Sequence, residues 1–179
     1  MSPSPLVLAL LASGLPSIVC AQERPPVLPT RDVDIVYHAG GMEQRWRFHA
    51  SDHKLRLDPP TKGVYMILDY PGHRMTTVSD TEQATLETAT LPSAPLSPGT
   101  TRRGTDHVAG LACTEWEAED TTGTPTLACF TADGVMLRAR RGTTVLAEAT
   151  RVSFAPLDGG LFVVPPGYQH HGYQHGHGP

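Results

Sequence analysis

The chain has 179 residues, of which 39% are hydrophobic, 18% charged and only 6% aromatic, and its formal net charge at pH 7 is −4. This length suits one domain, and the weak acidity argues against a nucleic-acid or anionic-membrane partner, which would require a basic surface. Glycine and proline, 17 residues each, are frequent but fall short of a disordered or collagen-like composition.

The chain begins with a segment typical of an export signal. Residues 6–15 form an apolar run that is too short to span a bilayer, which needs about 20 residues, and small residues precede Gln22. We therefore expect residues 1–21 to be a signal peptide and the mature protein to be soluble, periplasmic or secreted, without a transmembrane segment. Lipidation at Cys20 is the alternative, although Val19 stands where lipoprotein signals prefer Gly, Ala or Ser.

Alternating apolar and polar residues follow a Pro-rich leader at 22–30. Residues 33–37 and 42–48 alternate on either side of Gly40-Gly41, which predicts a hairpin. Later strands are predicted at 55–57, 64–68, 74–78, 135–140, 143–154 and 161–164, and 82–90 is a strand or a short helix, with strand favoured. Residues 91–104, rich in proline and glycine, are predicted to be the longest loop.

The fold class that this pattern predicts is mainly β, with little or no helix in a domain spanning residues 31–168. About nine strands separated by turn signals indicate a single curved antiparallel meander sheet, half-barrel or barrel-like. No amphipathic helix is predicted to cover its apolar face. We therefore expect a concave pocket on that face, with a completely filled interior as the alternative. The candidate ligand-binding residues are Trp46, Phe48, Val64, Met66, Leu68 and Leu86.

Two cysteines, Cys113 and Cys129, remain once a signal peptide is removed. An even pair in an oxidising compartment is a disulfide candidate. Both lie in strand-like segments, and residues 120–125 between them have turn composition. A hairpin would bring the two sulfurs together, so we predict a disulfide; a metal or catalytic role for the pair is the alternative.

Three short motifs resemble a known group of proteins: VAGLACTEW at 108–116, DGVMLR at 133–138 and FVVPPGY at 162–168. They resemble segments of small exported bacterial proteins of unassigned function, whose fold is similar to that of the periplasmic lipoprotein carriers. The resemblance implies a curved antiparallel half-barrel that holds an apolar cavity, usually with helices over the concave face. It implies a lipid or other apolar small molecule as the ligand.

The C-terminal residues 169–179 are predicted to form a flexible tail rich in histidine and glycine. The candidate metal ligands are His170, His171, His175 and His177. Imidazoles on a flexible backbone suit borderline metals such as Zn, Cu or Ni. A solvated tail without function is the alternative, and no other cofactor is expected.

No catalytic motif is found in the sequence: it contains neither a Gly-x-Ser-x-Gly elbow nor a phosphate-binding glycine loop. The leading hypothesis is therefore a non-enzymatic exported β domain that binds a small apolar ligand or acts as an envelope accessory protein. The alternative hypothesis is a periplasmic metal-binding protein that acts through its tail. The sequence does not indicate an oligomeric state.

Overall fold

The computed structural model describes residues 28–90, 100–119 and 122–172, which fold into one 12-stranded sheet. The chain segments 1–27, 91–99, 120–121 and 173–179 lie outside the described residues, and with them the predicted signal peptide. The strands are β1 (Val33–Ala39), β2 (Met42–His49), β3 (Lys54–Asp58), β4 (Val64–Asp69), β5 (Arg74–Ser79), β6 (Ala84–Ala89), β7 (Thr101–Val108), β8 (Leu111–Glu119), β9 (Pro125–Phe130), β10 (Met136–Arg141), β11 (Thr144–Ser153) and β12 (Gln169–Gly172). A single 3-10 helix, η1 (Gly159–Phe162), is present among the described residues.

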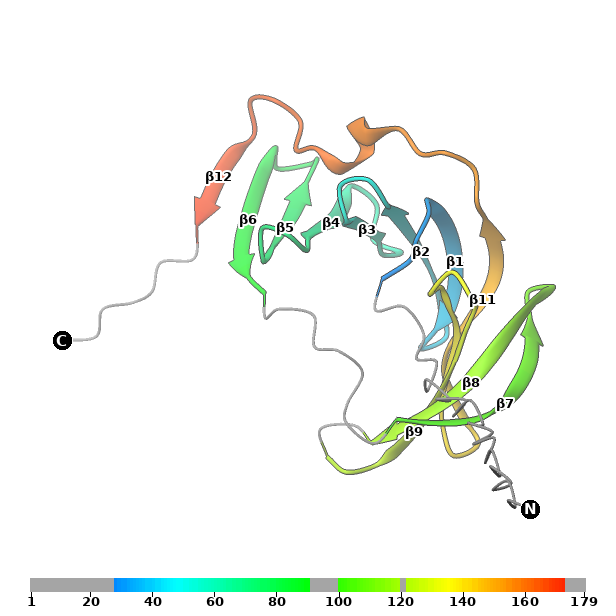
Figure 1. Ribbon diagram of the computed structural model, residues 1–179. Coiled ribbons are helices and arrows are strands. Elements are labelled where there is room, and N and C mark those ends of the chain that lie inside the picture. The colour runs from blue at the N-terminus through cyan, green and yellow to red at the C-terminus, as the bar shows by residue number, and fades with distance from the viewer. Residues whose placement is uncertain (1–27, 91–99, 120–121, 173–179) are drawn as a thin grey trace, which may run out of the picture.

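Two antiparallel meanders, β1–β6 and β7–β11, make up most of the sheet, and β1 pairs with β11 to join them (Figure 1). The strand order is β12-β6-β5-β4-β3-β2-β1-β11-β10-β9-β8-β7, so β12 and β7 are free edges and the sheet is open. The curled sheet is therefore not a closed barrel. The prediction of a mainly β fold with little helix is confirmed, whereas the predicted number of about nine strands is too low, because the sheet has 12.

Three differences from the expected strands have physical reasons. β7 falls partly in the predicted 91–104 loop, because this edge strand is mostly exposed and shows no apolar alternation. β12 lies in the predicted tail and has four exposed residues; it forms by backbone pairing with β6, in parallel rather than antiparallel orientation. Residues 161–164 are apolar, yet they form the end of η1 and a coil instead of a strand.

The predicted hairpin at Gly40-Gly41 is confirmed. Both glycines have positive φ, +58° and +80°, and Ala39 pairs with Met42 across the turn. Positive φ at both central residues is the requirement of the two-residue turns that match strand twist, and glycine meets it without steric cost. This turn sets the register in which Ile35 lies opposite Trp46.

The register places all six candidate ligand residues on one side of β1–β6, which we call the apolar face. Trp46 pairs with Leu57 and Leu57 with Met66, and Thr77 links that row to Leu86. A second row runs from Phe48 through Leu55 to Leu68. Val64 belongs to the same side because residues two apart on a strand share a face. The alternating segments and the apolar run at 64–68 thus predicted residues that share this face.

The opposite side of β1–β6 is crossed by residues 154–168, which we call the C-terminal strap; it connects β11 to β12 (Figure 1). Its anchor is Phe162, which is buried and stacks on the His49 ring with centroids 5.2 Å apart. Further along the strap, Val164 and Tyr168 pack against a second apolar cluster made by Tyr65, Ile67 and Val78. The strap therefore covers side chains that would otherwise face solvent.

Asp32 links the start of β1 to this strap. Its Oδ1 accepts a hydrogen bond from the Ala50 N–H at 2.9 Å, and its Oδ2 accepts one from the Leu157 N–H at 2.8 Å. Desolvation raises the pKa of Asp32, but the two backbone hydrogen bonds, with the charge of His49, outweigh it and lower the pKa below the usual value. The ionised carboxylate is the form that holds the three segments together.

We expect Asp32→Asn to reduce the free energy of unfolding at pH 7 by about 1–2 kcal/mol. This value is at the low end of the range for hydrogen bonds to a charged group, because the carboxylate is partly exposed. A carboxyl group whose pKa is lower in the folded state stabilises the folded protein at pH values above its unfolded pKa of about 3.9. This contribution is lost as the pH falls through the pKa of the folded state. Urea unfolding at pH 7 and pH 3 should therefore show that the difference in free energy of unfolding between wild type and variant is smaller at pH 3. A difference of equal size at both pH values would contradict an anionic link.

Candidate ligand site

A hollow of about 180 Å³ lies on the apolar face, between the sheet and the connection from β9 to β10. β1, β2 and β3 supply one wall, and the β9–β10 connection with the end of the leader supplies the other. The lining residues are Leu28, Pro29, Val33, Ile35, Tyr37, Trp46, Phe48, Leu55, Tyr70, Phe130, Gly134, Val135 and Met136. A dry cavity of ~150 Å³ holds one benzene molecule, so a ring or part of a hydrocarbon chain fits this space.

Only two of the six candidate ligand residues, Trp46 and Phe48, line the hollow. Val64, Met66 and Leu68 are partly buried on the same face outside it, and Leu86 is 45% exposed near the far edge of the sheet. The structure thus divides the expected site into a hollow over β1–β3 and an open apolar surface that continues over β4–β6.

The β9–β10 connection is held against the sheet by specific bonds. The Tyr37 hydroxyl donates to the Met136 carbonyl, and burial raises the pKa of Tyr37, so its hydroxyl stays protonated. The Thr30 N–H donates to the Asp133 carbonyl at 2.9 Å, which ties the leader to the same turn. Gly134 has φ +82°, which a side chain would disfavour, and this lets the chain reverse tightly. The second wall is therefore built into the fold.

Aromatic rings give the hollow its shape. Tyr37 meets Trp46 edge to face, with centroids 5.0 Å apart, and Phe48 contacts the tilted ring of Tyr70 at 6.3 Å. Such pairs each contribute about 0.5–1.5 kcal/mol beyond the area they bury. Among the described residues that line the hollow, none carries a charge. The site can therefore bind an apolar molecule by excluding water, as ligand pockets generally do.

Sequence reasoning missed the second wall of the hollow. Tyr70 follows β4 in a turn, and Phe130 lies just before the reversal of the chain at Gly134, so neither was among the candidate ligand residues. The aromatic character of Tyr70 and Phe130 was the available signal. The position of the β9–β10 connection against β1 depends on contacts between segments about 100 residues apart, such as that between Tyr37 and Met136.

The predicted cysteine pair lies at disulfide-bonding distance in the β8–β9 hairpin. The Cys113 and Cys129 sulfurs are 2.05 Å apart, and their Cα atoms are 5.4 Å apart. Cys129 pairs directly with Glu115, so Cys113 is its diagonal neighbour rather than the residue opposite. Both cysteines belong to the main core cluster, which also contains wall residues of the hollow such as Ile35.

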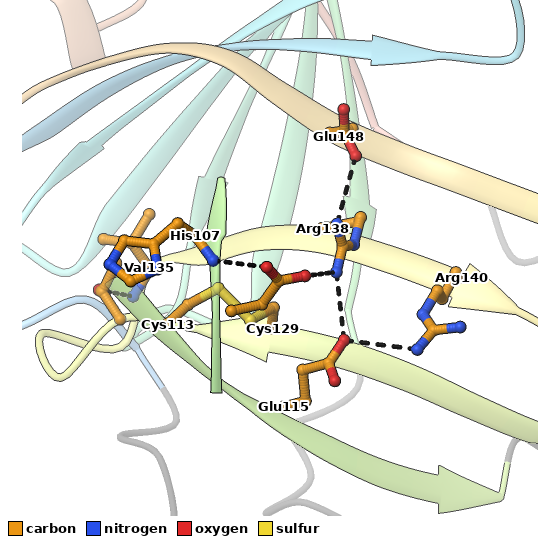
Figure 2. The surroundings of a disulfide bond; sticks show 10 residues. His107, Cys113, Glu115, Cys129, Val135, Arg138, Arg140 and Glu148 are labelled. Atoms are coloured by element: carbon orange, nitrogen blue, oxygen red, sulfur yellow. Dashed lines mark hydrogen bonds and ion pairs between the residues drawn. A yellow bond between two sulfur atoms is a disulfide. The ribbon is translucent and has the colours of Figure 1, made fainter. Parts of the chain in front are cut away.

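Arg138 lies beside the disulfide and gathers carboxylates around it (Figure 2). Its guanidinium pairs with Asp106, with Glu115 at 3.1 Å and with Glu148 at 3.7 Å. The hydrogen bond from Arg138 holds the pKa of Asp106 below its usual value. These ion pairs connect β10 to β7, β8 and β11, so the polar side chains here form an internal network.

The candidate metal ligands are only partly within the described residues. His170 and His171 lie in β12, where successive side chains face opposite sides of the sheet. The Nδ1 of His170 is 3.0 Å from the Thr85 hydroxyl. His175 and His177 lie outside the described residues. Within the described part of the chain, no group of three or more potential metal ligands comes together.

Comparison with known proteins supports the architecture. No protein-family model matches the chain, and no curated protein matches it by sequence. An uncharacterized conserved protein from Thermus thermophilus is similar in structure, with TM-score 0.58 and 10% identity over 80% of this chain and 91% of that one. PNGF-II has TM-score 0.50 and 13% identity, covering 79% of this chain and 31% of its own. MucB has TM-score 0.45 and 13% identity, covering 79% and 60%.

The fold and the hollow define the class: a mainly β protein built on a single open sheet. The identities to the Thermus protein and PNGF-II are low, so these likenesses show the fold alone. No helix formed by the described residues is long and apolar enough to cross a membrane.

Proposed function

We propose that this protein is an exported, non-enzymatic β domain that binds a small apolar or lipid-like ligand. The observation that carries the proposal is the uncharged, aromatic hollow on the apolar face. Export is supported by the apolar run at residues 6–15 and by the cysteine pair, since disulfides persist in oxidising compartments. The half-barrel of a lipoprotein carrier is the architecture that we propose for the curled sheet.

The hollow is smaller than the sites that bind drug-sized ligands, which typically have volumes of about 300–1,000 Å³. A long hydrocarbon chain would therefore fill it with one end only. The rest of such a chain has apolar surface to follow, because the apolar face continues from Leu57 to Met66 and Leu86. Burying that surface contributes about 25 cal/mol per Å² removed from water.

Filling the hollow tests the proposal. Leu55→Phe enlarges a side chain of the wall, and we expect it to weaken binding of a fluorescent fatty acid such as cis-parinaric acid by about tenfold or more, equivalent to 1.4 kcal/mol. The measurement is a fluorescence titration of purified wild type and variant. Loss of affinity would follow from steric exclusion, because the added ring occupies space that the probe needs.

Leu146→Phe is the matched control, because it makes the same change at a 39% exposed leucine of β11, outside both the hollow and the apolar face of β1–β6. It should retain wild-type affinity. If wild type binds neither cis-parinaric acid nor a neutral hydrophobic dye, ligand binding is refuted and the role of an envelope accessory protein remains. Equal affinity in all three proteins would place the ligand outside the hollow.

A further inference from the structure

The described residues that line the hollow carry three polar side-chain groups. The Tyr37 hydroxyl is occupied by the Met136 carbonyl, and the Trp46 indole N–H faces the Gln44 side-chain oxygen at 3.4 Å. The third is the Tyr70 hydroxyl, which has no hydrogen-bond partner among the described residues. Among the described side chains of the lining, Tyr70 is therefore the one whose polar group is available to a ligand.

Tyr70 is held in place by its backbone. Its N–H donates to the His53 carbonyl and its own carbonyl accepts from the His73 N–H, both at 3.3 Å. Its ring packs on Phe48, whose ring also contacts His53 at a centroid distance of 6.5 Å. The Tyr70 ring thus has a fixed position on the wall. Burial raises the pKa of Tyr70, so the hydroxyl stays protonated at neutral pH and can donate.

We infer that Tyr70 is a specificity residue and that the ligand of the hollow carries a carbonyl or carboxylate oxygen, as a medium-chain fatty acid does. This inference rests on the proposed function and names the chemistry of its ligand. The oxygen accepts a hydrogen bond from the Tyr70 hydroxyl, and the hydrocarbon part lies among Val33, Ile35 and Phe48. Because no described residue of the wall is charged, this hydroxyl is the feature that distinguishes such a molecule from a plain hydrocarbon.

Two probes separate this inference from the proposed function: octanoate, which has acceptor oxygens, and toluene, which has none. Tyr70→Phe keeps the ring and removes the hydroxyl. We expect it to raise the dissociation constant of octanoate about three- to tenfold, the usual effect of one hydrogen bond, and to leave that of toluene unchanged. NMR titrations that follow the backbone amides of β1 and β2 give both constants.

The matched control is Tyr168→Phe, because the Tyr168 hydroxyl bonds to Asp80 at 2.9 Å and its ring packs on the opposite face of the sheet. It should bind both probes like wild type. If octanoate binds wild type and Tyr70→Phe equally well, the inference is overturned. Binding of toluene to both proteins would in that case still support the hollow as a ligand site. Equal loss of both probes in Tyr70→Phe also overturns the inference, because Tyr70 is then a wall residue only. If neither probe binds wild type, the proposed function fails as well.

Discussion

Replacing Cys113 and Cys129 together by alanine is expected to lower the free energy of unfolding by about 3 kcal/mol, the chain-entropy value for a loop of this size. The two residues are 16 positions apart, so the bond restricts the unfolded chain substantially. Both side chains are also buried, at 4% and 2% exposure, in the cluster that supports the hollow. Urea unfolding of the oxidised wild type and of the double variant measures the difference.

Reduction provides the control for this prediction. A reductant should lower the urea midpoint of the wild type toward that of the double variant and leave the double variant unchanged. Both cysteine side chains are buried, which restricts access of an attacking thiolate, so reduction of the folded protein should be slow. Mass spectrometry after alkylation without reductant should find no free thiol; two alkylated cysteines in the exported protein would refute the bond.

The strands with one buried side were predictable from the sequence because period-two alternation depends only on neighbouring residues. The parts of the two rows on β2 and β3 were predicted in this way, whereas residues 64–68 were predicted as a strand because they form a short, fully apolar run. The cysteine pair was predictable for a similar reason, since the strand-like segments around the two cysteines and the turn composition between them suggested the hairpin. The edge strand β12 was not predicted because its side chains are exposed on both faces. Its stability comes from backbone pairing with its parallel partner β6.

The two coverings of the sheet were not predictable because each depends on contacts between distant segments. The apolar run at 161–164 indicates burial correctly for Phe162, but its partner is the ring of His49 rather than a neighbouring strand. On the other face, the β9–β10 connection covers β1 in place of a helix. It leaves room for the hollow because it is short and reverses at Gly134.

Removing the side chain that anchors the C-terminal strap is expected to destabilise the protein. Phe162→Ala should lower the free energy of unfolding by about 3–4 kcal/mol, the usual cost of removing a buried aromatic side chain. Phe162 is only 2% exposed, and the Arg56 guanidinium beside it donates to the Leu161 carbonyl at 3.0 Å, so the strap loses its central anchor. Equilibrium urea unfolding measures the loss.

Val163→Ala is the matched control because the neighbouring side chain is 59% exposed, and it should change stability by no more than about 0.5 kcal/mol. Folded Phe162→Ala should still bind toluene with wild-type affinity, since the strap and the hollow lie on opposite faces of β1–β6. Equal urea midpoints for the two variants would show that the strap does not stabilise the sheet. A loss of toluene binding by folded Phe162→Ala would show instead that the strap shapes the hollow through the sheet, because no strap residue lines the hollow.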